Sequence, residues 1–284
     1  LFCIESAKEL AQKRKPTKTK RILDEILFKV GTYCKKLEAE SLYFYCKEFV
    51  NEMNDYSIQG NQSQRGNRRV FRRRSSDIKR AQYIYSYQII QKKGKKKETR
   101  KLVRGSDRGR GRTTGAQRAR INRASVVFER MIFGPIGILG FDWQSMYDYR
   151  IVREDNLFDQ PVYVVDCIPK NPLNSDSNNV LFGQAWIRKS DYSVLRIDWE
   201  PKSVVLANKK YGFSKFSFPR LRFQLYTEYK LKRSGIRYPT HGFFKEYYIG
   251  NKDRENVLRT VSIDYKNYRF FKVETDTELS PPEI

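Results

Sequence analysis

Several residue patterns are scarce or missing in this sequence, and each absence excludes a class of function. There is one histidine, His241, and there are four cysteines, none spaced as Cys-x-x-Cys, which argues against a zinc site. The sequence contains no nucleophile elbow, P-loop, dinucleotide-binding fingerprint or His-Glu-x-x-His motif. It also has no apolar run of about 18 residues, the length that a transmembrane helix needs. We therefore expect a non-catalytic protein with no metal, no cofactor and no membrane-spanning helix.

Acidic residues are too few to balance the basic ones, and the imbalance is regional. The 284 residues include 57 Lys and Arg against 32 Asp and Glu, a formal net charge of +25. Residues 61–130 hold 23 of the basic residues and 4 of the acidic ones, whereas the rest of the chain is nearly balanced. A region of this kind attracts polyanions such as nucleic acid, anionic lipid or acidic glycan.

The basic residues form runs in two expected loops, at 54–80 and 92–123. One interpretation is a set of solvated charges that only raises solubility. A second is binding to lipid phosphate or acidic polysaccharide, and a third is binding to RNA through the Arg-Gly repeats of 104–111. No RNA-binding motif accompanies these repeats, so nucleic acid is the least favoured of the polyanions. The candidate anion-binding residues are Arg72, Arg73, Arg74, Lys92, Lys93, Lys95, Lys96 and Lys97.

The sequence is rich in the alternating apolar pattern of antiparallel strands. Residues 161–201 predict three consecutive strands, and in the third Leu195, Ile197 and Trp199 share one face while polar residues share the other. A strand with one polar face is typical of an antiparallel sheet that is covered on one side only. The same pattern or a β-branched, aromatic composition predicts further strands at 41–53, 82–91, 96–104, 145–153, 221–231, 243–249, 257–265 and 268–275.

One clear helix is expected, over 21–37, because apolar residues repeat there at helical spacing. These residues are Ile22, Ile26, Val30, Tyr33 and Leu37. The segment 124–140 is expected to be a broken helix or an apolar plug, since glycine and proline interrupt it.

Together these elements predict an α+β fold in which a large, curved antiparallel sheet of about ten strands, a half-barrel, wraps over an N-terminal helix. We expect one such domain over 21–276, with a lead-in at 1–20 and a C-terminal tail at 277–284.

Two cysteines lie where they could cross-link the helix to the sheet. Cys34 is near the end of the predicted helix, and Cys46 is within the strand that follows. In an oxidising compartment these two could form a disulfide; the alternative is a pair of buried thiols.

The order of these elements resembles the outer-membrane lipoprotein-sorting superfamily of bacterial periplasmic carriers. The resemblance is carried by a helix before a long meander, by PVYVVDCIPK leading to FGQAWIRKSDYSVLRIDW, by EYKLKRSGIRYPT and by TVSIDYKNYRFFKVETD. Within the superfamily the chain is similar to a group of bacterial envelope proteins of unassigned function, whose first helix also ends in a Tyr-Cys pair with a second cysteine downstream. The resemblance covers most of 21–276.

This resemblance implies a concave sheet whose apolar interior binds a lipid or the acyl chain of a lipoprotein, in the periplasm or cell envelope. The start at Leu1 rather than Met is consistent with a removed or truncated leader. The basic loops would steer the protein to an anionic membrane surface. The residues expected to line the cavity are Tyr147, Tyr149, Ile151, Leu195, Ile197, Trp199, Phe223, Leu225 and Tyr229. For each of them ordinary core packing is the alternative, and it would give a structural or interaction protein with a filled core.

Overall fold

The computed structural model describes residues 18–40, 44–55, 78–92, 95–105, 134–170, 182–200, 221–249 and 255–271. The lead-in and tail expected at 1–20 and 277–284 lie largely or wholly outside these ranges. The helices are α2 (Lys18–Glu40), α4 (Gly134–Leu139) and α5 (Phe141–Gln144). The strands are β1 (Phe44–Asp55), β2 (Ile78–Lys92), β3 (Lys95–Gly105), β4 (Tyr147–Leu157), β5 (Gln160–Pro169), β6 (Gly183–Arg188), β7 (Val194–Trp199), β8 (Leu221–Glu228), β9 (Leu231–Arg233), β10 (Ile236–Tyr238), β11 (His241–Ile249) and β12 (Glu255–Phe270).

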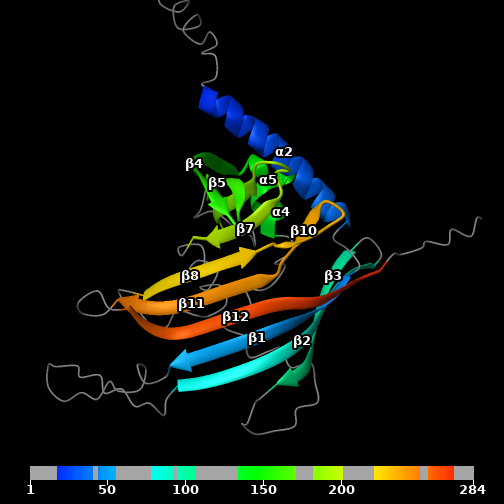
Figure 1. The fold of residues 1–284 in the computed structure, drawn as a ribbon, viewed down its shortest axis with the longest axis vertical. Helices are drawn as coiled ribbons and strands as arrows, with labels where there is room; N and C mark the ends of the chain where they lie inside the picture. The colour runs from blue at the N-terminus through cyan, green and yellow to red at the C-terminus, as the bar shows by residue number, and fades with distance from the viewer. Residues whose placement is uncertain are drawn as a thin grey trace, which may run out of the picture.

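Ten of the strands form one antiparallel sheet in the order β3-β2-β1-β12-β11-β8-β7-β6-β5-β4, and β9 and β10 form a separate hairpin. Strands β4 to β8, then β11 and β12, follow one another as a meander. Strand β1 pairs with β12, so the first strand of the sheet lies beside the last. Figure 1 shows α2 across the β4–β7 end of the sheet, with β8, β11, β12, β1 and β2 curving away from it. The predicted α+β fold, a large antiparallel sheet with an N-terminal helix, is confirmed.

Helix α2 packs on the rest of the protein through the face that its sequence predicts. Ile26, Val30 and Leu37 are at most 1% exposed, and Tyr33 is also buried. Ile22 packs at the margin of the same hydrophobic cluster. The helix contacts α4, α5, β10 and β4, so it is held by the short helices and the hairpin more than by the broad sheet.

The predicted strands differ most from the structure in two places. Residues 257–265 and 268–275 were expected as separate strands, but β12 continues from Glu255 to Phe270. Asn267 has a φ of 57°, and the β1–β12 register shifts between Tyr45 and Lys47, so Asn267 and Tyr268 make a bulge opposite Cys46 rather than a turn. The strand expected over 221–231 ends at Glu228, where the chain leaves the sheet to form the β9–β10 hairpin.

Among the described strands, β3 and β4 are the edges of the sheet, and both carry features that discourage pairing with another chain. Strand β3 is rich in lysine and arginine, and the register of β4 shifts between Ile151 and Arg153. Charged residues and bulges at edges protect a sheet from aggregation. Within the described ranges, none of the helices combines the length and apolarity that a bilayer crossing requires.

Candidate functional site

The candidate site is the inner face of the sheet, where it meets what we call the helical cover: α2, α4 and α5. Helix α4 begins directly on this face. A Cβ atom added to Gly134 would lie 2.7 Å from the Tyr229 hydroxyl oxygen and 3.2 Å from Cζ2 of Trp199. Glycine therefore allows α4 to approach the residues of β7 and of the segment after β8 closely.

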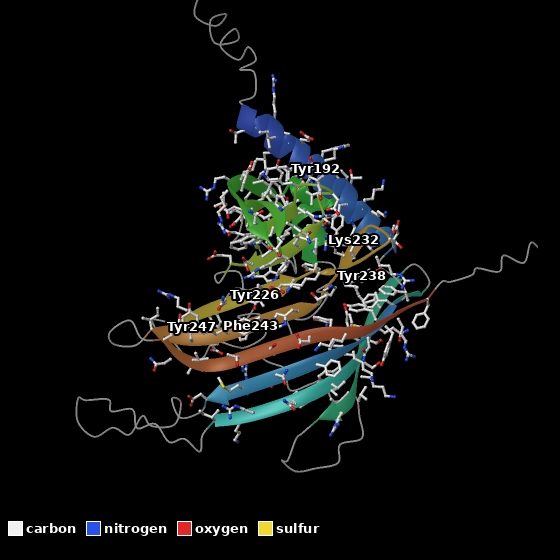
Figure 2. The ribbon with its side chains drawn as sticks, in the orientation of Figure 1. Tyr192, Tyr226, Lys232, Tyr238, Phe243 and Tyr247 are labelled. Carbon is white, nitrogen blue, oxygen red and sulfur yellow. The ribbon has the colours of Figure 1, made fainter. Side chains whose placement is uncertain are left out.

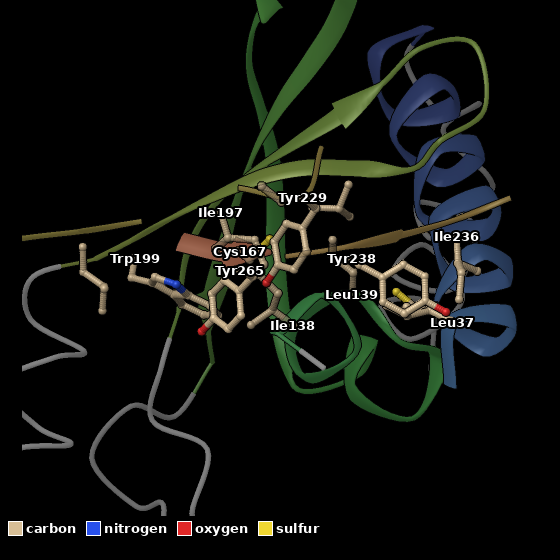
Figure 3. Packing of buried hydrophobic residues seen from close by; sticks show 14 of the residues in the cluster. Leu37, Ile138, Leu139, Cys167, Ile197, Trp199, Tyr229, Ile236, Tyr238 and Tyr265 are labelled. Carbon is tan, nitrogen blue, oxygen red and sulfur yellow. The ribbon is translucent and has the colours of Figure 1, made fainter. Parts of the chain in front are cut away.

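The residues that the sequence predicted for the cavity come together, with one exception. All except Leu195 belong to the main hydrophobic cluster. Six are buried and two, Tyr149 and Ile151, are partly buried at the β4 edge. Figure 3 shows Ile138 of α4 beside Tyr229, and Leu139 on the side of Leu37 and Tyr238. In this structure Ile197, Trp199 and Tyr229 thus lie against the start of α4, whereas Phe223 packs beside Phe244 of β11.

Leu195 does not share the face of Ile197 and Trp199, contrary to the prediction. Ile187 pairs with Val194 and Trp186 pairs with Arg196, so Leu195 is the extra residue of a bulge. The bulge puts Val194 in the main cluster and Leu195 in a second, small cluster with Val162 and Val164. Leu195 is therefore removed from the cavity set.

A few hydrogen bonds join the cover to its surroundings. The Tyr149 hydroxyl of β4 donates to the carbonyl oxygen of Ile138 in α4 over 2.7 Å. Burial, with the nearby Cys167, raises the pKa of Tyr149, so the hydroxyl keeps its proton and remains a donor at neutral pH. The side-chain amide of Gln144 donates to the carbonyls of Leu27 and Leu139, each over 2.8 Å, and so fastens α5 to α2 and α4.

The disulfide expected between Cys34 and Cys46 is absent, and both residues are free, buried thiols. Cys34 donates to the carbonyl of Pro135 in α4, whereas Cys46 lies beside Tyr268 in β12. The two side chains diverge because β1 is placed between β12 and β2 rather than against the end of α2. Burial raises the pKa of both thiols well above the usual value, which leaves them protonated and unreactive.

The inner face also carries charged residues that were not expected from the sequence. Glu48 of β1 is 1% exposed, and both of its carboxylate oxygens accept from Nε of Arg100 in β3, over 3.0 and 2.9 Å. The Arg100 guanidinium also lies 4.6 Å from the centre of the Tyr87 ring. The sequence did carry a signal, because Glu48 alternates with Cys46 and Val50 on the buried face of its strand.

A second inward-facing polar group lies further along β1. Arg259 of β12 donates from Nε to the Asn54 side-chain oxygen over 2.6 Å, and its guanidinium is 3.4 Å from the Glu52 carboxylate. Both charged pairs occupy the β1–β12 half of the sheet, away from α4. The inner face is thus apolar under the helical cover and partly charged beyond it.

The anion-binding candidates can be placed only in part. Arg72, Arg73, Arg74 and Lys93 lie outside the described residues. The backbone places Lys92 at the end of β2, paired with Lys95, and Lys96 and Lys97 follow in β3. These lysines therefore lie in one hairpin at an edge of the sheet, and the loop expected over 92–123 is wrong for Lys95–Gly105, which pairs with β2 as strand β3.

In the described part of the chain, no cluster of three His, Cys, Asp or Glu residues is arranged to hold a metal ion. Nδ1 of His241 is 2.8 Å from an Asp264 carboxylate oxygen, and the ring of Tyr226 lies beside it. The chemical capacity of the inner face is therefore apolar contact, with a few fixed charges at one side.

No protein-family model and no curated protein sequence matches the chain. Solved structures do show a similar fold. A DUF1329 family protein from Desulfovibrio piger is 15% identical, with a TM-score of 0.41, and covers 90% of this chain and 94% of its own. A putative outer membrane lipoprotein-sorting protein domain from Vibrio parahaemolyticus is 10% identical, with a TM-score of 0.39, and covers 90% of this chain and 95% of its own.

A LolA superfamily protein from Nitrosomonas europaea is 11% identical, with a TM-score of 0.30. The alignment covers 88% of this chain and 94% of the Nitrosomonas chain. At these identities and TM-scores the likenesses say nothing about what the chain binds. The superfamily that the sequence resembles is thus found among the structural neighbours of this chain.

Proposed function

We propose that this protein binds a lipid, or the acyl chain of a lipoprotein, between the inner face of its sheet and the helical cover, and that it catalyses no reaction. One observation carries the proposal. At the β4–β7 end of the sheet the inner face is apolar and is covered by the short helices α4 and α5, together with α2, and a hydrogen bond from the Tyr149 hydroxyl to the Ile138 carbonyl links the sheet to α4. An acyl chain can replace apolar contacts of this kind at little polar cost, because few hydrogen bonds to α4 are broken when it moves.

The energetics of such a replacement are favourable for a long chain. Moving α4 aside would expose Ile138 and Leu139, which are at most 2% exposed. Exposing two such side chains costs about 3–6 kcal/mol, whereas each buried methylene of a ligand contributes about 0.8 kcal/mol. Roughly six buried methylenes would offset the movement, which is fewer than a typical membrane lipid chain offers.

The charge distribution supports lipid binding at the surface of an anionic membrane. The lysines of the β2–β3 hairpin, and the excess of basic residues over 61–130, would attract the protein to anionic headgroups. We place the protein in the bacterial periplasm or cell envelope, where delivery of lipids or lipoproteins to the outer membrane would use both properties.

Native mass spectrometry of the gently purified protein, and titration with the fluorescent fatty acid dansyl-aminoundecanoic acid, test the proposal. Ile151 and Val152 offer a matched pair, because Ile151 packs at the margin of the inner face and Val152 is 39% exposed. Ile151→Arg should weaken probe binding by about tenfold or more, since it puts a charge at the apolar site. Val152→Arg should leave it unchanged. No co-purified lipid and no saturable probe binding would refute the proposal.

A second candidate function is a structural or interaction protein whose core is permanently filled. It is favoured by the burial of Ile138 and Leu139, which are at most 2% exposed and already pack within the hydrophobic cluster. The same titration separates the two, because a permanently filled core binds no probe in either variant.

A further inference from the structure

Three connections of the sheet meet at one rim, and a single arginine joins them. Arg237 lies in β10, outside the main sheet. Its Nε donates to Oγ of Ser193 over 2.7 Å, and its Nη2 donates to the Gln160 side chain over 3.4 Å. Its Nη1 donates to the carbonyls of Tyr229 and Lys230 over 3.5 and 3.3 Å. The guanidinium thus connects the β9–β10 hairpin to the β6–β7 turn and to the start of β5.

Arg237 is only 5% exposed, so its charge must be compensated inside the protein. Ser193, which accepts from Arg237, donates in turn to Oδ1 of Asp191 over 2.6 Å. Asp191 is also 2.8 Å from the ammonium of Lys232 and 3.0 Å from the guanidinium of Arg188. The buried charge is therefore the inner end of a network that reaches the surface at Lys232.

The same network holds helix α2. The backbone N–H of Arg237 donates to the Tyr33 hydroxyl oxygen over 3.2 Å. In the β6–β7 turn, the Tyr192 hydroxyl donates to the Glu25 carboxylate over 3.3 Å. Figure 2 shows Tyr192 and Lys232 on the side of the molecule that carries α2. The β9–β10 hairpin and the β6–β7 turn therefore each form a hydrogen bond with α2. The two contacted helix residues, Tyr33 and Glu25, are eight positions apart, about two turns.

The rim also holds backbone conformations that are unfavourable by themselves. Phe158 and Tyr192 have φ values of 53° and 55°, in the left-handed region that bulky residues avoid. Ser234, at the tip of the β9–β10 hairpin, has a φ of 51°. Such conformations persist where surrounding contacts enforce them, and they concentrate at clamps and switches.

We propose that the β9–β10 hairpin is a clamp that holds the helical cover on the sheet, with Arg237 as its positioning residue, and that a ligand enters when the clamp releases α2. The first half concerns the fold alone. The second half rests on the proposed lipid-binding function, because it assigns the clamp to the entry of that ligand.

Hydrogen–deuterium exchange of the unliganded protein tests the first half. Arg237→Gln removes the charge and most of the donors, Arg237→Lys keeps the charge but loses the planar fork, and Ser193→Ala removes one acceptor. Arg269→Gln is the control, because it removes the same charge from an exposed position in β12. The two Arg237 variants should speed exchange in α2 and the hairpin by about tenfold or more, Ser193→Ala should speed it in the same segments to a smaller extent, and all three should leave the β1–β2–β12 amides unchanged.

The association rate of dansyl-aminoundecanoic acid tests the second half. It should rise in Arg237→Gln and in Ser193→Ala, and stay at the wild-type value in Arg269→Gln. If Arg237→Gln does not fold, as judged by its thermal unfolding, Ser193→Ala carries both measurements because it is the milder change.

The outcomes separate the clamp from the proposed function. Unchanged exchange in α2, or exchange that rises equally throughout the sheet, would overturn the clamp. Local loosening without probe binding in any variant would leave the clamp in place and refute lipid binding. Probe binding whose association rate is the same in every variant would overturn the role of the clamp in ligand entry.

Discussion

Tyr149 and Ile138 are joined by a hydrogen bond from the tyrosine hydroxyl to the isoleucine carbonyl oxygen, 2.7 Å long, which connects strand β4 to helix α4. It is a directional contact in a region that otherwise packs by apolar side chains. Removing it tests how far α4 depends on the sheet edge for its position.

Tyr149→Phe keeps the ring and removes the hydroxyl, so the carbonyl of Ile138 loses its donor. We expect the free energy of unfolding to fall by about 1 kcal/mol, the usual net value of such a bond. Urea unfolding measures the change. Tyr147→Phe, on the same strand, is the control; an equal loss there would mean that the effect comes from the tyrosine hydroxyls in general rather than from this bond.

Two glycines of the same helix should respond in opposite ways to alanine. A Cβ at Gly134 would lie 2.7 Å from the Tyr229 hydroxyl oxygen, whereas a Cβ at Gly137 would meet nothing within 4 Å. Gly134→Ala should therefore destabilise the protein by about 1–3 kcal/mol through overpacking. Gly137→Ala should be neutral or stabilise it by up to about 1 kcal/mol through helix propensity. Thermal unfolding compares the two, and equal melting temperatures would contradict the placement of α4.

The thiols of Cys34 and Cys46 should be protected but not linked. Burial raises the pKa of each, so iodoacetamide should not modify either in the native protein at neutral pH. After denaturation without reductant, both should be alkylated. Peptide mass spectrometry reads out the two states, and a Cys34–Cys46 linked peptide would contradict the structure.

The pair formed by Glu48 and Arg100 should be costly to break from one side. Arg100→Met leaves the buried Glu48 without its guanidinium and should cost about 3–5 kcal/mol. Glu48→Gln in the same protein should recover part of this loss, because no charge then remains to be compensated. A double-mutant cycle in urea measures the coupling. Strictly additive effects would show that the two side chains do not interact in solution.

Asp191 should make the stability of the rim depend on acid pH. Burial by itself would raise its pKa, but hydrogen bonds from Lys232 and Ser193 hold the pKa of Asp191 below the usual value. A group whose pKa is lower in the folded state stabilises the fold above its unfolded pKa of about 3.9, and that contribution is lost as the pH falls further. Unfolding curves should show this loss below about pH 4 in the wild type and less of it in Asp191→Asn. Equal pH profiles would contradict the pairing.

The sequence predicted secondary structure best where the pattern involves residues that are close together in the chain. The alternating residues of 194–199 gave the bounds of β7 correctly, and helical spacing identified the buried face of α2. The bulge at Leu195 was missed because Leu195, Ile197 and Trp199 alternate perfectly. The only hint was the extra apolar residue Val194 directly before them, and such a pair fits either a bulge or a strand end.

The remaining errors concern contacts between distant parts of the chain. Cys34 and Cys46 are close in sequence, but the pairing of β1 with β12 carries Cys46 away from the helix. Arg237 lies between the strands that the sequence predicted, and its partner Ser193 lies 44 residues earlier. Nothing local distinguishes an arginine that will be buried from one that will be solvated, because its burial depends on partners that only the assembled fold supplies.

The pairing of β1 with β12 has a consequence for biosynthesis. The ribosome releases β1, β2 and β3 long before β12, which must lie beside β1, so one side of this three-stranded unit stays open until β12 has been made. Pairing between strands some two hundred residues apart is slow, and until it occurs the unpaired strand edges of folding intermediates are exposed to aggregation. The sheet therefore stays incomplete until β12 has been made, and we expect the polypeptide to depend on chaperones up to that point.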